Sequence, residues 1–169
     1  MAKLSRRGRL LLRAFHIFFM GLWIGGIAST LVMFLLIGTA HSDEALRFMY
    51  LVTRILYIPG GLGMLGTIIT GIFLARRTPW GFFKHRWLIY KEAIYILYLV
   101  SVVVGNIVFS KATALVGSEG LSALQNPAYT GAWTGLIITS VLNLLILISI
   151  VFVSEIKPWR KHTGAEEAA

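Results

Sequence analysis

The side chains best suited to chemistry lie in the first long apolar run of the chain, residues 10–37. His16, Met20 and Trp23 recur at i, i+4 and i+7, so they share one face of a helix. An ionisable group inside a membrane is costly and usually faces a cofactor, a partner or the bundle interior. A haem needs one good axial ligand and a slot. The pattern therefore favours haem with His16 as metal ligand, and the alternative is a structural histidine hydrogen-bonded to a neighbouring helix.

A second candidate, Lys91, lies near the start of the third apolar run and follows Trp87 by one helical turn. His16 and Lys91 lie roughly 9 Å and roughly 6 Å inside their helices at a rise of 1.5 Å per residue. Both helices are expected to enter from the same side of the membrane, so both groups would line one pocket. For Lys91 the alternative is snorkelling of its ammonium toward the lipid headgroups.

Composition places these residues in a membrane. The chain has 169 residues, of which 57% are hydrophobic and 14% charged, whereas soluble domains carry about 25% charged residues. No cysteine is present, which excludes disulfides, iron–sulfur clusters and zinc–thiolate sites. We therefore expect an integral membrane protein with a single transmembrane domain over residues 1–160.

Four apolar runs predict an all-α, four-helix transmembrane bundle with helices over residues 10–38, 45–75, 87–110 and 128–156. Ser42 or Asp43 is the expected N-cap of the second helix, and Pro59 is expected to kink it. Its many glycines favour a close helix-packing face over a cofactor bed, although Gly63 to Gly71 would also suit a flat ligand. We further expect a short interfacial helix in the connection 76–86, a polar loop over 111–127 with a short surface helix, and a disordered tail over 161–169.

The basic residues are distributed unevenly. Thirteen of the 16 lysines and arginines lie in the N-terminus, the second connection with the adjoining turn, or the tail, and only Arg47, Arg54 and Lys111 lie toward the other side. The positive-inside rule then places both termini in the cytoplasm of what we expect to be a bacterial inner membrane. The net charge of +9 is explained by contact with anionic lipid headgroups, and without a recognition module it does not indicate nucleic acid.

Several short motifs resemble a known family. HIFFMGLW followed by IGG resembles the first helix of HemJ-type protoporphyrinogen oxidases and their CopD-like relatives, and RWLIYK is similar to the third-helix motif of the HemJ type. QNP before the last run and EIKPW at its end resemble variants of the last-helix signatures. The resemblance implies a cytochrome-b-like bundle in which His16 is the axial ligand and Lys91 the second functional residue. It also implies that electrons pass from a porphyrinogen to a quinone or the respiratory chain.

The chain departs from that family at three places. Ala28 to Thr30 stand where the family has an arginine after its glycine motif, Val102 stands in place of a histidine, and only Asn126 and Pro127 remain of the polar set in the last loop. These departures argue against porphyrinogen oxidation while leaving haem binding intact. The chain therefore resembles a divergent relative of the superfamily.

The leading hypothesis is a haem b protein that transfers electrons or oxidises a small lipophilic or porphyrin-like substrate. Lys91 would then bind a propionate, a substrate carboxylate or the sixth iron position, and the cations Arg13, Lys84 and Arg86 would pair with propionates. The sixth ligand stays open: it is absent, supplied by a second protomer of a homodimer, or one of Met20, Met64, Lys91 and His85.

The alternatives from other classes are a copper or small-solute transporter and a cofactor-free membrane subunit. The amides Asn106 and Asn143 are interpreted as hydrogen-bond links between helices.

Overall fold

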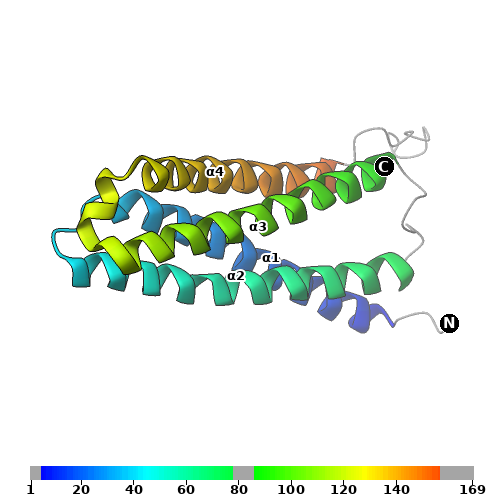
Figure 1. Cartoon of the computed structure of the whole chain (residues 1–169). Coiled ribbons are helices and arrows are strands. Elements are labelled where there is room, and N and C mark those ends of the chain that lie inside the picture. Colours follow the sequence, from blue (N-terminus) through cyan, green and yellow to red (C-terminus); the bar gives the residue numbers. More distant parts are fainter. Residues whose placement is uncertain (1–4, 78–85, 157–169) are drawn as a thin grey trace.

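The computed structural model describes residues 5–77 and 86–156, which form four long helices and one short 3₁₀ helix (Figure 1). The helices are α1 (Arg6–Ile37), α2 (Asp43–Arg77), α3 (Arg86–Glu119) and α4 (Pro127–Ile156), and η1 (Gly120–Gln125) precedes α4. All four α-helices are long and apolar enough to cross a membrane. The prediction of an all-α bundle of four transmembrane helices is thus confirmed, and the orientation of its termini stays a prediction.

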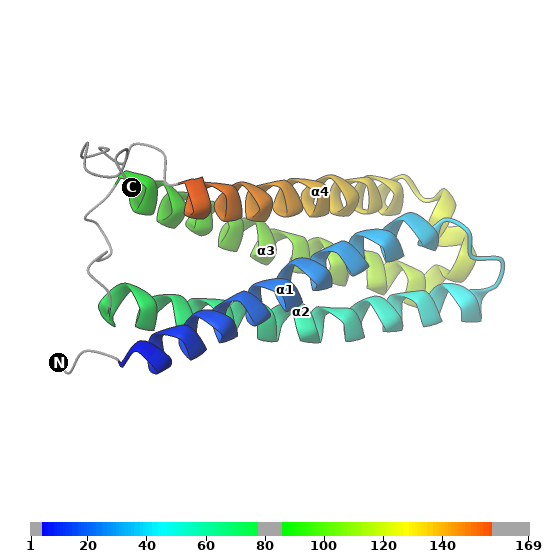
Figure 2. The same cartoon turned by 180° about the vertical axis from the view of Figure 1, so that it is seen from behind.

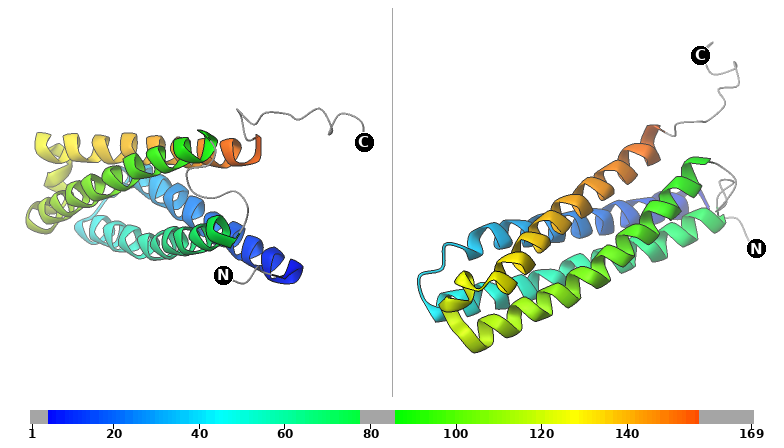
Figure 3. Two further views of the ribbon diagram at one scale, coloured as in Figure 1. Left: turned by 90° about the vertical axis from the view of Figure 1, so that its right-hand side faces the viewer. Right: turned by 45° about the horizontal axis from the view of Figure 1, so that its top comes forward.

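The helices pack as two pairs, α1 with α2 and α3 with α4, and the pairs are joined mainly by α1 lying against α4 (Figures 2 and 3). We call the end where α1 begins and α4 ends the termini end, and the end that holds residues 38–42 and η1 the turn end. Trp133 Nε1 of α4 donates to the Phe34 carbonyl of α1 at 2.7 Å, toward the turn end. In contrast, α2 and α3 make few contacts with each other, so the bundle is least closed between these two helices.

Glycine backbones form the contact between α1 and α2. A Cβ placed on Gly26 would lie 2.5 Å from Gly60 Cα, and one placed on Gly63 would overlap the Trp23 backbone nitrogen. Only residues without a side chain permit backbones to approach so closely. The interpretation of these glycines as a helix-packing face is therefore correct, whereas Gly71, farther along α2, lies beside the His16 ring.

An aromatic core closes the turn end of the bundle. The buried Tyr50 donates its hydroxyl hydrogen to Tyr129 Oη at 3.0 Å, and its ring stacks on Phe109 with centroids 5.5 Å apart. Outside this core, Asp43 Oδ1 accepts a hydrogen bond from the Leu121 backbone nitrogen at 2.8 Å, which ties η1 to the start of α2. The turn end thus holds a packed core of buried side chains.

The third helix is longer than the sequence predicted. The expected loop over 111–127 is wrong for residues 111–119, because α3 continues to Glu119 with Ala112 and Val116 buried in the core. The helix ends where Gly120 adopts a φ of +59°, a left-handed conformation that favours glycine. Sequence polarity had suggested a loop, but the segment consists largely of good helix formers and places one face on the core.

The other helix boundaries are close to those predicted. α1 begins four residues early, at Arg6, because Ser5 Oγ accepts from the Gly8 backbone nitrogen at 3.1 Å. Ser42 caps α2 as expected, accepting from the Ala45 backbone nitrogen at 3.1 Å. The predicted interfacial helix in the second connection and the predicted disordered tail lie mainly or wholly outside the described residues.

The outer surface of the bundle is apolar, as lipid contact requires. Phe48, Ile96 and Phe152 are each more than 60% exposed, and many other large apolar side chains point outward with them. In water such a surface would drive aggregation, whereas in a bilayer it meets hydrocarbon. Together with the four spanning helices, this surface is that of an integral membrane protein.

Candidate functional site

A cavity of about 360 Å³ lies at the termini end of the bundle, between all four helices. We call it the inner cavity. Its wall is mostly apolar, and its polar or ionisable lining residues are His16, Trp23, Thr67, Lys91, Glu92, Tyr95 and Ser154. Ligand sites in proteins combine an apolar wall with a few placed polar groups in this way. The inner cavity is therefore the candidate functional site.

Four of the predicted site residues meet in the inner cavity. His16, Met20 and Trp23 reach it from α1, and Lys91 reaches it from α3. Because these helices are far apart in sequence, their meeting supports the expectation that His16 and Lys91 share a pocket.

The remaining predicted site residues do not line the inner cavity. Arg13 and Arg86 are exposed and are not among its lining residues. Met64, a possible sixth ligand, lines a different cavity, and Lys84 and His85 lie outside the described residues.

A hydrogen bond from α2 fixes the His16 ring. His16 Nδ1 lies 2.8 Å from Thr70 Oγ1, and Thr70 in turn donates its hydroxyl hydrogen to the Gly66 carbonyl at 2.6 Å. Because that hydrogen is used within α2, we assign Thr70 Oγ1 as acceptor and His16 Nδ1 as donor. The resulting tautomer carries its lone pair on Nε2, the nitrogen that a metal would bind. A ring nitrogen held by a hydrogen bond while the other binds metal is the usual arrangement of histidine ligands.

The sequence did not identify Thr70, although it orients the predicted ligand. Thr70 is buried and belongs to the glycine-rich half of α2. A threonine mid-helix commonly bonds its own backbone, so only the crossing of α1 over α2 shows that it also faces His16. The one signal in the sequence is its position directly before Gly71, whose missing side chain leaves space for the imidazole.

Two charged residues of α3 line the inner cavity. Lys91 Nζ lies 5.8 Å from the centroid of the Trp87 ring, within range of a cation–π contact. Glu92 also lines the cavity, although neighbouring positions on a helix point in different directions. Helical spacing alone thus did not indicate Glu92, which gives the cavity a carboxylate in addition to the ammonium of Lys91.

Two hydroxyl groups at the inner cavity have no hydrogen-bond partner within the described part of the chain. They are Thr67 Oγ1 and Tyr95 Oη, which come from α2 and α3 and both line the cavity. Buried polar groups are nearly always paired in folded proteins, with water if not with protein. These groups are therefore available to a polar ligand or to water inside the cavity.

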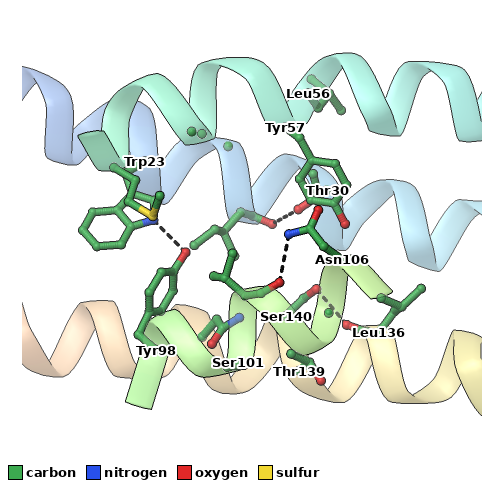
Figure 4. A pocket seen from close by; sticks show the side chains of 18 residues that line it. Trp23, Thr30, Leu56, Tyr57, Tyr98, Ser101, Asn106, Leu136, Thr139 and Ser140 are labelled. Atoms are coloured by element: carbon green, nitrogen blue, oxygen red, sulfur yellow. Dashed lines mark hydrogen bonds between the residues drawn. The ribbon is translucent and has the colours of Figure 1, made fainter. Parts of the chain in front are cut away.

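A second cavity, of about 270 Å³, lies beside the first and nearer the turn end (Figure 4). We call it the central cavity. Trp23 lines both cavities and donates its indole hydrogen to Tyr98 Oη at 2.7 Å, a bond visible at one side of Figure 4. The two rings meet edge to face with centroids 4.9 Å apart. Trp23 thus belongs to the walls of both cavities instead of serving the inner one alone.

The donor set of the described residues suits a haem better than a metal ion bound by protein alone. Residues 5–77 and 86–156 contain no group of three or more histidine, aspartate or glutamate side chains placed to hold a metal ion. A protein-only metal site needs several converging donors, whereas haem iron needs one or two axial ligands. His16 supplies one such ligand, and Met20 is the sulfur donor nearest to it in sequence.

Comparisons of the chain with models of protein families, with curated proteins and with solved structures found no match. The resemblance to HemJ-type and CopD-like proteins thus stays a prediction from short motifs. Asn126, one of the residues that carried it, has a local structural role: its Oδ1 accepts from the Ala128 backbone nitrogen at 2.9 Å at the start of α4. The geometry of the inner cavity is therefore the basis for inferring a function.

Proposed function

We propose that the chain is a haem b-binding integral membrane protein in which His16 is the axial ligand through Nε2. The observation that carries this proposal is the hydrogen bond from His16 Nδ1 to Thr70 Oγ1 at 2.8 Å, which selects the metal-binding tautomer of a histidine that lines a mostly apolar cavity. Bound haem would supply a one-electron redox couple. The proposed activity is electron transfer or oxidation of a small lipophilic or porphyrin-like substrate.

The other residues of the inner cavity have supporting roles in this proposal. Met20, one helical turn after His16, would pack against the cofactor, and Trp23, which lines both cavities, would form its wall toward the central cavity. Lys91 is the proposed catalytic residue, because its ammonium can bind a propionate or a substrate carboxylate. Arg13 and Arg86, which are exposed on α1 and α3, would reach propionates only at the cavity rim.

The proposed setting is a bacterial inner membrane with both termini in the cytoplasm. The described basic residues support it, since most of them lie near the termini end, from Arg6 to Arg13, at Arg76 and Arg77, and at Arg86. The redox partner would be a quinone or a component of a respiratory chain. A homodimer is supported by Gly21 and Gly25 of α1, because a Cβ on either would meet nothing within 4 Å and the pair forms a small-xxx-small contact face.

Two other functions use the same observations differently. A His16 that only links α1 to α2 would make the same bond to Thr70, and the chain would then be a cofactor-free subunit. A copper site would combine His16 with the Met20 thioether, which lines the same cavity. Small-solute transport is disfavoured by the aromatic core at the turn end, where Tyr50 and Tyr129 are bonded across the bundle.

The test is an absorption spectrum of the detergent-purified protein, oxidised and dithionite-reduced, with a pyridine haemochrome assay and metal analysis. The proposal expects a Soret band, a sharp reduced α band and about one haem b per chain. Copper without haem would favour the copper site. A colourless, metal-free protein that also fails to take up added haem would refute the proposal and leave the subunit hypothesis.

A further inference from the structure

The central cavity has features of a second binding site that are separate from those of the inner cavity. It is lined by residues of all four helices, and its polar lining groups include Thr30 of α1, Ser101 and Asn106 of α3, and Ser140 of α4 (Figure 4). Among the described residues that line it, none carries a charge. A ligand for this cavity is therefore neutral and is recognised by hydrogen bonds.

One buried amide in the central cavity lacks a hydrogen-bond partner. Asn143 is 7% exposed and lines the cavity from α4, and its Oδ1 accepts no hydrogen bond from the described part of the chain. The prediction that this amide links two helices is thus wrong for its oxygen. An unpaired acceptor in a membrane interior is costly, so Asn143 Oδ1 requires a donor that the described residues do not supply.

Two hydroxyl groups that line the central cavity together with Asn143 already use their hydrogens within their own helices. Thr30 donates its hydroxyl hydrogen to the Ile27 carbonyl at 2.9 Å, and Ser140 donates to the Leu136 carbonyl at 2.7 Å. Both hydroxyl groups have thus used their hydrogens and retain lone pairs toward other groups. A ligand that pairs with Asn143 Oδ1 therefore carries a hydrogen-bond donor such as O–H.

The rest of the wall indicates the body of that ligand. Tyr57 and Tyr98 supply aromatic surface, and Gly60, Gly61 and Gly105 supply backbone without side chains. A flat aromatic ring suits such a wall, because rings pack against one another and against bare backbone. A cavity of about 270 Å³ is small, so only the head of a lipophilic molecule would be enclosed.

A route between α2 and α3 would connect the central cavity with the bilayer. The turn end is closed by the aromatic core, whereas α2 and α3, which both line the cavity, make few contacts with each other. Asn106 lines the cavity and is also exposed, and its amide nitrogen donates to the Val102 carbonyl at 2.8 Å. This side chain therefore lies where the cavity meets the surface, and an alkyl tail would leave between α2 and α3 into lipid.

From these observations we propose that the central cavity binds the head of a lipophilic phenol or hydroquinone, whose O–H donates to Asn143 Oδ1 while its tail stays in the bilayer. This inference stands on the central cavity alone and does not rest on haem binding. Trp23 would form the wall between the phenol and the inner cavity.

The test compares decylphenol with decylanisole, its methyl ether, on the full chain in lipid nanodiscs. The ether keeps the ring and tail but lacks the O–H donor. A decylphenol that carries a diazirine on its ring is photolysed with the protein, and the labelled residues are located by mass spectrometry. Unlabelled decylphenol or decylanisole is then added as a competitor of this labelling. We expect labels on residues of the central cavity and displacement by decylphenol at concentrations about tenfold lower than by decylanisole, the effect of one hydrogen bond.

Two variants of α4 test whether Asn143 causes the difference between decylphenol and decylanisole. Asn143→Leu removes the acceptor and should abolish the difference between phenol and ether, whereas Ser149→Ala, at a residue that lines neither cavity, should preserve it. Equal displacement by the two compounds in the wild type, or labels spread over lipid-facing residues, would overturn the proposal. The wild-type comparison tests phenol binding even if Asn143→Leu fails to fold. Phenol binding is measured on both haem-free and haem-loaded protein, so that a failure of the phenol proposal can be distinguished from a failure of haem binding.

Discussion

Replacing Thr70 by valine isolates the contact that would make His16 a haem ligand. The substitution keeps the β-branched shape but removes the oxygen that lies 2.8 Å from His16 Nδ1. Without that acceptor the imidazole loses its hydrogen bond to the Thr70 side chain. Loss of such a supporting hydrogen bond typically weakens metal affinity about 10- to 100-fold, which corresponds to about 1.4–2.8 kcal/mol. We expect the apparent Kd for haem, titrated through the Soret band into haem-free protein, to rise by that factor.

The control for this experiment is Thr53→Val in the same helix. Thr53 is buried and donates to the Met49 carbonyl at 2.8 Å, so its replacement loses the same kind of intrahelical bond at a residue that lines neither cavity. We expect Thr53→Val to bind haem like the wild type and Thr70→Ser to restore most of the affinity. A purely structural His16 predicts instead that Thr70→Val lowers the melting temperature without changing haem affinity. Equal Kd values for Thr70→Val, Thr53→Val and wild type would refute our reasoning.

Three further predictions follow from the same geometry. His16→Ala should abolish the haem absorbance and leave helical circular dichroism unchanged, and retained haem would show that another residue holds the iron. Lys91→Ala should slow turnover or shift the haem spectrum, whereas unchanged activity and spectrum would mean that Lys91 only snorkels. Gly26→Leu should lower thermal stability in detergent by about 1–3 kcal/mol or more, because its Cβ would lie 2.5 Å from Gly60 Cα. Gly25→Leu, with nothing within 4 Å, should keep that stability and reduce only the dimer fraction in cross-linking.

The sequence predicted the four helices well because a spanning segment is a local property. About 20 consecutive apolar residues identify a helix that crosses a bilayer whatever its neighbours do. The end of α3 was predicted less well, because residues 111–119 are held by tertiary contacts: Ala112 and Val116 are buried against the core. Polarity alone could not distinguish this helical segment from a loop.

Part of the candidate site was predicted from the sequence. The predicted residues are mainly those that share one face of a helix, and the residues that were missed depend on contacts between helices. His16, Met20 and Trp23 share a face of one helix, so their spacing was enough to group them, and the depth argument brought in Lys91. Thr70 could not be found in this way, because its contact with His16 depends on where α1 crosses α2. The sequence likewise could not show that Asn143 Oδ1 is unpaired, because hydrogen-bond partners on other helices depend on how the helices pack.

Both cavities have one structural cause, the glycine contact between α1 and α2. With Gly26 against Gly60 and Gly63 against the Trp23 backbone, α2 is drawn onto α1 and cannot also close on α3. A bundle with equal contacts between all neighbours would fill its centre with side chains, as close-packed interiors do. Here the space left beside α3 is lined by polar groups, one of which, Asn143 Oδ1, has no hydrogen-bond partner in the described part of the chain. Glycine packing at one interface therefore creates the binding space at the other, which is why Gly26→Leu should disturb both cavities together.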